Sequence, residues 1–217
     1  MRLQNALSDL IESQVRLSSQ VIIEDMFDVD NVRFIGGADV AYSGEYGCGV
    51  LVVYEYPGLK LVDKAFFRSR VSFPYIPGFL SFRELPFIKT AYEKVHIKPD
   101  LLFINGNGIL HFRFFGLASH TGVVLGVPTI GVSQNLLCGV VKKGKVYYRN
   151  RLVGYEYTSR RGCRPIYVSP GHNISLKTAL SITKSCIHGH KLPEPLHVAD
   201  KMSKSCISKY QSTRFDF

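Results

Sequence analysis

The spacing of apolar residues changes from helical to alternating along the first third of the chain. Residues 3–26 place apolar side chains at helix-like intervals, which predicts an N-terminal helix. The stretches 33–42, 48–56 and 59–72 are rich in β-branched and aromatic residues, and short Gly/Pro breaks separate them. This pattern is typical of three successive antiparallel strands.

A helical spacing returns over residues 81–95. We expect Ser81 to be the N-cap of this helix and Glu84 to complete a capping box, because the two residues have the spacing of that motif.

The second half of the chain alternates between apolar runs and helical stretches. It also contains a basic region of hairpin character, with the segments KKGK, RNR and RRGCR. The predicted elements are strand 101–104, helix 114–125, strand 128–134, hairpin region 139–164, strand 165–171, helix 175–188 and a last helix 197–210.

This order of elements indicates an α/β fold. Three antiparallel strands, a helix, and then strands alternating with helices describe a mixed sheet of five or more strands, covered by helices on both faces. A three-stranded meander that continues as β-α-β is the order of the RNase H-like fold. By itself, that analogy assigns no function.

Composition narrows the possible partners. The chain has 217 residues, of which 46% are hydrophobic, and this is enough for one domain with its own core. Lys and Arg outnumber Asp and Glu by 27 to 17, giving a formal net charge of +10. This excess suits a polyanion such as nucleic acid, although a merely soluble basic protein has the same balance.

The five cysteines are scattered and show no metal-binding spacing, so we expect free thiols in a reducing compartment. The first residues do not resemble a signal peptide, and no apolar run approaches the roughly 20 residues that span a bilayer. We therefore expect no membrane partner and a location in the cytoplasm, the nucleus or both.

Three acidic residues are candidates for chemistry: Asp39, Glu84 and Asp200. Asp39 lies inside an apolar strand, where a carboxylate is costly unless it is paired or binds a metal. Taken singly, the three have simpler explanations: a salt-bridged Asp, a capping Glu and a surface helix residue. In an RNase H-like sheet, however, their elements converge beside the end of the fourth strand, where Asn105 lies.

Such a cluster suits Mg²⁺, since hard cations take oxygen ligands and two of them about 4 Å apart activate water and the leaving oxygen of a phosphodiester. Nearby His111 has two interpretations. It either caps the following helix or contacts a phosphate near the metals.

Several ordered stretches resemble the endonuclease V family. They span most of the chain between residues 36 and 200, which makes the resemblance highly specific. The stretches are GGADVAY (36–42), FPYIPGFLSFRE (73–84), PDLLFINGNGILHFRFFGLASHTGV (99–123), VPTIGVSQNLL (127–137), VSPGH (168–172) and LPEPLHVAD (192–200).

The resemblance implies one endonuclease V-like domain over residues 1–217, with the N-terminal helix 3–26 and a core 33–211. It implies an enzyme that recognises inosine in single- or double-stranded RNA or DNA. Such an enzyme cuts the second phosphodiester bond on the 3′ side of the inosine, using Mg²⁺ or, as a substitute, Mn²⁺. It also implies a monomer.

Site residues follow from the matching motifs. The implied metal ligands are Asp39, Glu84, Asn105 and Asp200, and His111 and Gln134 join them as catalytic candidates. FPYIPG resembles a wedge that enters between bases, and small residues beyond it resemble the pocket of a flipped base. The implied nucleic-acid contacts are Pro74, Tyr75, Ile76, Pro77, Gly78, Leu80, Gly106, Gly108, Gly116, Ser119 and His120.

Two positions depart from the family pattern. Asn105 stands where the family has Asp, and Gln134 stands where it usually has Lys. An amide offers a cation one neutral oxygen, so the loss of charge should weaken metal binding and slow the reaction. Asn105 is compatible with an engineered trap, a slow natural enzyme or a protein that only binds. Because two positions differ, we favour a natural divergent member.

Two other functions remain open on the sequence alone. One is a reader that binds inosine without cutting. The other is a general RNA-binding protein that uses the basic residues between 142 and 164.

Overall fold

The computed structural model describes residues 2–212, so residue 1 and residues 213–217 of the expected domain lie outside the described part. Nine strands are described: β1 (Phe34–Ser43), β2 (Tyr46–Glu55), β3 (Lys60–Arg70), β4 (Leu101–Asn105), β5 (Thr129–Ser133), β6 (Val140–Lys142), β7 (Lys145–Tyr148), β8 (Arg151–Tyr157) and β9 (Ile166–His172). The helices are α1 (Arg2–Ser18), α2 (Leu80–Lys94), α3 (Leu117–Leu125), α4 (Leu176–Ser185) and α5 (Glu194–Ser212).

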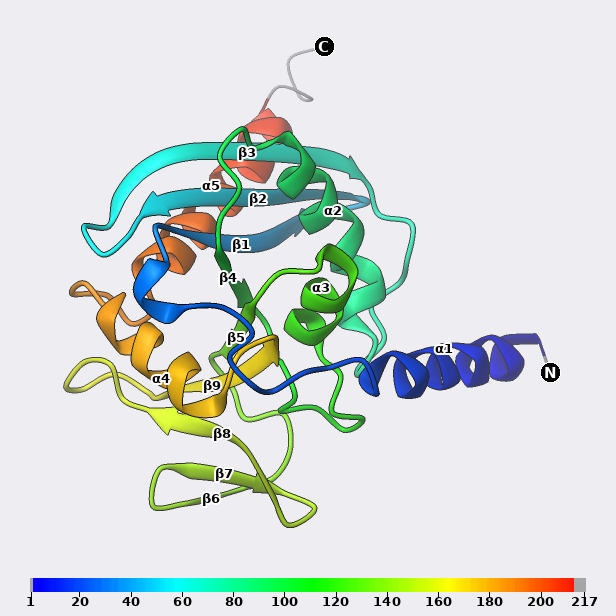
Figure 1. Cartoon of the computed structure of the whole chain (residues 1–217). Helices are drawn as coiled ribbons and strands as arrows, with labels where there is room; N and C mark the ends of the chain where they lie inside the picture. The colour runs from blue at the N-terminus through cyan, green and yellow to red at the C-terminus, as the bar shows by residue number, and fades with distance from the viewer. Residues whose placement is uncertain (1, 213–217) are drawn as a thin grey trace.

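All nine strands form one mixed sheet with the order β3-β2-β1-β4-β5-β9-β8-β7-β6 (Figure 1). β1, β2 and β3 form the antiparallel meander, while β4 pairs with both β1 and β5 in parallel. β9 returns antiparallel to β5. The predicted α/β, RNase H-like sheet is confirmed.

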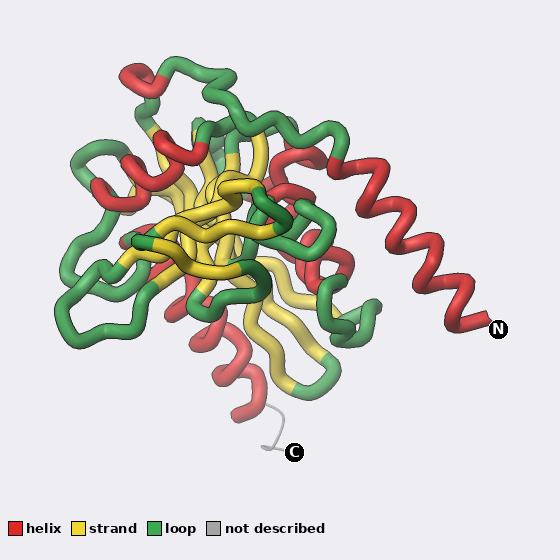
Figure 2. Tube along the Cα trace, turned by 90° about the horizontal axis from the view of Figure 1, so that it is seen from below, coloured by secondary structure: helices red, strands yellow, loops and turns green. Residues whose placement is uncertain are grey.

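Helices cover both faces of this sheet, as predicted (Figure 2). On one face, Phe87 and Ile88 of α2 and Leu117 of α3 pack against apolar residues of β1, β2 and β4. On the other face, Ile182 of α4 and Leu196 of α5 join a core with β4, β5 and β9. The sheet is thus buried between two helical layers, and the ends of its central strands remain available for a site.

Three predicted helices are shorter than expected, and the one expected over residues 175–188 is observed as Leu176–Ser185. The N-terminal helix ends at Ser18 rather than near residue 26. The β-branched run Val21-Ile22-Ile23 favours extended backbone, and Ile22 N–H donates to His172 Nδ1 at 3.3 Å. The helix expected over residues 114–125 begins at Leu117 because Phe114 has a φ of +54°, which an α-helix does not accept.

The prediction of a capping box at the start of α2 is wrong. The N-cap residue is Phe79, whose side chain makes no capping bond, and its N–H donates to Ile76 O at 3.0 Å. Ser81 lies inside the helix, buried, with no hydrogen-bond partner for its hydroxyl among the described residues. Glu84 is therefore available for another role.

The expectation of five free thiols is also wrong. Cys48 of β2 and Cys206 of α5 form a disulfide that links positions 158 residues apart, while Cys138, Cys163 and Cys186 are free. The sequence did not indicate this pair because the contact exists only once α5 lies across β2.

Of the described helices, none is long and apolar enough to cross a membrane.

Reduction of this disulfide should destabilise the protein, because the crosslink closes a long loop in the unfolded chain. We expect the free energy of unfolding to fall by about 2–4 kcal/mol when reductant is added. Chemical denaturation with and without reductant measures this change. Cys206→Ser should show no response to reductant, whereas Cys138→Ser should respond as the unmodified protein does.

Thiol titration of the denatured protein provides the direct check. We expect three reactive thiols before reduction and five after it. Five thiols before reduction would contradict the crosslink.

Candidate functional site

Two neighbouring parallel strands bring Asp39 and Asn105 together. In the register of β1 and β4, Ala38 pairs with Ile104, so the next residue of each strand lies at the same level. Asn105 Nδ2 donates a hydrogen bond to Asp39 Oδ1 at 2.7 Å. The Asn105 amide thus brings no charge to the site, and it occupies one oxygen of Asp39.

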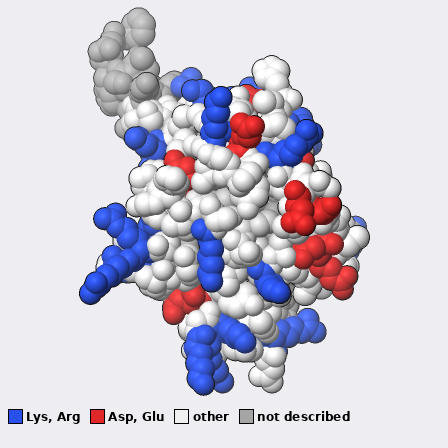
Figure 3. All heavy atoms as spheres, turned by 60° about the vertical axis from the view of Figure 1, so that its left-hand side comes forward, with Lys and Arg blue, Asp and Glu red and all other residues white. Residues whose placement is uncertain are grey.

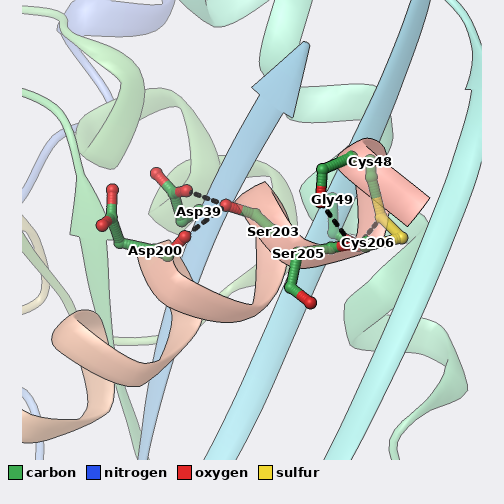
Figure 4. The surroundings of a disulfide bond; sticks show 8 residues. Asp39, Cys48, Gly49, Asp200, Ser203, Ser205 and Cys206 are labelled. Carbon is green, nitrogen blue, oxygen red and sulfur yellow. Dashed lines mark hydrogen bonds between the residues drawn. A yellow bond between two sulfur atoms is a disulfide. The ribbon is translucent and has the colours of Figure 1, made fainter. Parts of the chain in front are cut away.

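Helix α5 approaches the same carboxylate from the other side (Figure 4). The hydroxyl of Ser203 donates to Asp39 Oδ2, and Asp200 lies one turn earlier on the helix. The Asp200 carboxylate in turn accepts from Lys204 Nζ at 2.7 Å. Sequence reasoning missed Ser203. Its position three residues after a candidate ligand on a predicted helix was the available signal.

Glu84 completes the cluster from α2. It is 8% exposed, and burial, together with the nearby Asp39 carboxylate, raises its pKa to about 8. Burial also raises the pKa of Asp39, while the hydrogen bonds from Ser203 and Asn105 oppose that shift. Two carboxyl groups therefore share a buried site in which their joint ionisation is unfavourable.

This donor set fits a divalent cation in its chemistry, because buried carboxylates that resist ionisation are stabilised by a positive charge among them. Within residues 2–212, however, no group of three His, Cys, Asp or Glu side chains is arranged to hold a metal ion. Asn105 replaces one carboxylate, and Asp200 is engaged by Lys204. The carboxylates are gathered, but they are not arranged as a preformed metal site.

A cavity of about 120 Å³ is lined by residues close in sequence to this cluster, among them Ser81, three residues before Glu84. Asn107, two residues beyond Asn105, contributes to its wall. The described lining residues are Gln14, Tyr75, Pro77, Gly78, Leu80, Ser81, Asn107, His111, Phe115, Gly116, Leu117 and Leu137. The cavity is mostly apolar, with a few amide, hydroxyl and imidazole groups, which is the usual character of a small-molecule pocket.

The expected nucleic-acid contacts divide into two groups. Five of them line the cavity: Tyr75, Pro77, Gly78, Leu80 and Gly116. Tyr75 is 69% exposed, so its ring projects from the loop. The other six are outside the lining. Pro74 and Ile76 belong to the same loop, Gly106 and Gly108 pack against Leu117 and Pro170, and Ser119 and His120 are buried in α3.

Three histidines are buried among the described residues, His111, His120 and His172, and burial lowers the pKa of each. Burial lowers the pKa of His120 to about 4, and its ring lies between those of Phe82 and Phe115. Burial and the neighbouring Arg113 lower the pKa of His111 to about 4 as well. His111 Nδ1 accepts from Arg113 N–H at 3.3 Å, so this nitrogen carries no proton.

Gln134 lies just beyond the end of β5 and is exposed. Its Oε1 accepts a hydrogen bond from Lys191 Nζ at 3.1 Å. A lysine ammonium from the segment before α5 thus stands beside Gln134.

The raised pKa of Glu84 should make the metal-free protein less stable at high pH. The folded state holds the Glu84 proton up to about pH 8, whereas the ordinary pKa of a glutamate side chain is 4.5. Stability from this group is therefore complete below about pH 4.5 and is lost as pH rises through 8. Because one pKa unit corresponds to about 1.4 kcal/mol, a few kcal/mol are at stake.

Urea unfolding in EDTA between pH 5.5 and 8.5 measures this loss. Glu84→Gln should show a much flatter pH dependence than the unmodified chain. Equal slopes for the two proteins would show that Glu84 ionises normally.

The described fold matches the folds of proteins that are already known. The endonuclease V family model matches residues 15–201. Over 208 residues the chain is 40% identical to the endonuclease V of Dictyoglomus turgidum. This match covers 92% of this chain and 90% of that protein. The Bacillus subtilis endonuclease V structure has a TM-score of 0.88 at 29% identity, covering 95% of this chain and 94% of that one.

A Ciona intestinalis endonuclease V structure was solved in complex with a 24mer DNA containing an inosine followed by a ribo-adenosine. It has a TM-score of 0.87 at 29% identity and covers 95% of this chain and 99% of that one. On the agreement of family model, sequence identity and fold, this chain belongs to the endonuclease V family of nucleases, which hydrolyse phosphodiester bonds in a metal-dependent reaction.

Proposed function

We propose that this protein recognises inosine in RNA or DNA and hydrolyses the second phosphodiester bond on the 3′ side of it. The main support is the position of the Asp39–Glu84 carboxylate pair. Asn105 donates a hydrogen bond to Asp39 of this pair, and two residues later Asn107 forms part of the cavity wall. A base held in the cavity would place its own backbone near the carboxylates.

Asp39 and Glu84 would hold the cation, Mg²⁺ or its substitute Mn²⁺. Asn105 would add its amide oxygen and Asp200 a carboxylate oxygen. A bound cation would supply electrostatic stabilisation of the phosphorane-like charge and lower the pKa of the attacking water. Asn105 must turn its amide so that oxygen rather than nitrogen faces the site. Lys204 holds Asp200 at its present position through their ion pair.

The loop of residues 73–78, called the wedge loop below, would separate the inosine from its neighbours. Tyr75 offers an exposed ring for stacking, and Pro77 restricts the backbone beside it. Behind the loop, Phe115 and Leu117 form apolar walls, and Asn107 offers a polar contact to the edge of the base. Extrusion of a base into such a cavity is the general solution for enzymes that read one base.

A basic hollow on β6 and β7 supports binding of the strand away from the inosine. It is lined by Lys142, Lys143, Lys145 and Arg149, with Tyr147 and Tyr148 between them. Figure 3 shows Lys and Arg spread over much of one face of the molecule, with Asp and Glu gathered mainly towards one side. We propose that the protein acts as a monomer, in the cytoplasm, the nucleus or both.

A second candidate function is that of an inosine reader without turnover. It is favoured by the hydrogen bond from Asn105 to Asp39 and by the pairing of Asp200 with Lys204, since both reduce the negative charge open to a cation. Cavity and wedge loop would serve a reader as well as they serve a nuclease.

A cleavage assay separates the two functions. End-labelled single-stranded RNA and DNA, each with one inosine, should be cut slowly in Mg²⁺ or Mn²⁺. Asn105→Asp should raise the single-turnover rate by about 10²–10³, the effect of one well-placed electrostatic group. Asp39→Ala should abolish cutting, and strands without inosine should stay intact. Binding of inosine with no product from either the unmodified or the Asn105→Asp protein would identify a reader.

Binding should also depend on the ring of Tyr75. In EDTA, Tyr75→Ala should weaken binding to inosine-containing duplex about tenfold or more, since a base–aromatic stack is worth about 1–3 kcal/mol. Fluorescence anisotropy measures this change. Tyr75→Phe should bind normally, because it keeps the ring. Equal affinities for the alanine variant and the unmodified protein would contradict the wedge.

A further inference from the structure

The carbonyl of Gly78, the last residue of the wedge loop, is held by two side chains from distant parts of the chain. Gln14 Nε2 of α1 donates to it at 3.1 Å, and Arg113 Nη2 donates at 2.6 Å. Gly78 has a φ of +80°, a conformation that glycine adopts without strain. The donors come from 64 residues before and 35 residues after Gly78.

Gln14 and Arg113 also bind each other. Arg113 Nε donates to Gln14 Oε1 at 2.5 Å. Because the guanidinium can only donate and the carbonyl can only accept, the two contacts determine which end of the Gln14 amide faces which partner. Gln14 is 1% exposed, an unusual degree of burial for an amide side chain on an outer helix. Its two polar ends are thus both committed inside the protein.

Arg113 connects this arrangement to the surrounding loop. Its guanidinium carbon lies 4.6 Å from the ring centre of Phe79, the residue after Gly78. Its backbone N–H donates to His111, which also lines the cavity. Gln14, Gly78 and Arg113 therefore form one clamp between α1, the wedge loop and the loop that follows β4.

A clamp at this position suits a loop that must push against stacked bases. Unstacking a base costs a few kcal/mol, and a loop that yields under that load cannot force the base out. Hydrogen bonds from a charged guanidinium are stronger than those between neutral groups. They hold the base of the loop, while Tyr75 at its tip remains exposed.

We propose that Gln14 and Arg113 are positioning residues that keep the wedge loop rigid for base extrusion, so that α1 is part of the recognition machinery. This inference rests on the proposed function. It predicts a selective defect: variants of the clamp lose activity where the inosine must be pulled from a stacked duplex. They keep it where the inosine is already unstacked, as in a bulge.

Hydrogen exchange of the free protein tests the clamp itself, without any substrate. Gln14→Glu keeps the side-chain size and the contact to Arg113, but it places an oxygen against the Gly78 carbonyl. Exchange of the amides between residues 73 and 82 should become at least tenfold faster. Val15→Ala, at a 54% exposed position on the same helix, is the matched control and should change nothing. Unchanged exchange in Gln14→Glu would overturn the clamp.

Cleavage of two matched substrates tests the role of the clamp. If the unmodified chain cuts slowly, the Gln14 substitutions are made in the Asn105→Asp protein, which then serves as the parent. On a duplex with a stacked inosine, Gln14→Glu should raise KM about tenfold and leave kcat within about twofold. With the inosine in a bulge, KM should stay within about twofold. The fluorescence of a 2-aminopurine placed beside the inosine should show that Gln14→Glu unstacks the duplex less than the parent protein does. Gln14→Ala should show the same pattern without the added repulsion.

Equal losses on the two substrates would overturn the role in base extrusion. A parent protein that does not distinguish inosine from adenosine would contradict the proposed function, and the exchange measurement would still decide whether the clamp exists.

Discussion

The site depends on the burial of two carboxyl groups beside each other. Asp39 lies on strand β1, and Glu84 lies on helix α2, which packs against the sheet. Burial raises the pKa of both carboxyl groups. Without a cation, one of them keeps its proton near neutral pH, and Asn105 and Ser203 support the other with hydrogen bonds. The sheet order places Asn105 beside Asp39, because β4 is the parallel neighbour of β1 and ends at the level of Asp39. The end of β4 also positions Asn107 in the cavity wall, and α5 packs against β1 beside the pair.

Asn105 changes the electrostatics of the site more than its shape. An Asp at that position would put a third carboxyl group next to a pair that already resists ionisation, and only a tightly bound cation would make the ionisation of all three favourable. With Asn105, the cluster carries less negative charge, and hydrogen bonds within the protein pair its polar groups. Lys204 on Asp200 and Lys191 beside Gln134 are consistent with this shift, since positive charge is supplied by the protein's own side chains. The same scaffold can therefore serve slow hydrolysis or binding, depending on how readily Asn105 turns.

Much of the fold was predictable because its signals are local. Alternation and breaks marked β1 to β3, and the apolar run before Asn105 marked β4 together with the residue at its end. The failures involve contacts between distant segments. Glu84 had the spacing of a capping box, yet the helix begins at Leu80 and turns Glu84 towards Asp39. The pairing of Cys48 with Cys206, the bond from Ser203 to Asp39 and the burial of Gln14 all arise only when α5 and α1 are in place. No pattern within one segment reports such contacts.

We propose that the Asp39–Glu84 pair binds a cation and that binding displaces the proton shared by the pair. Titration of the protein with Mn²⁺ at pH 7, in buffers of different ionisation enthalpy, measures the number of protons released. Since the pKa of Glu84 is about 8 without metal, binding should release close to one proton, and Glu84→Gln should release almost none. Binding without proton release, or equal release by the Glu84→Gln variant, would contradict the account.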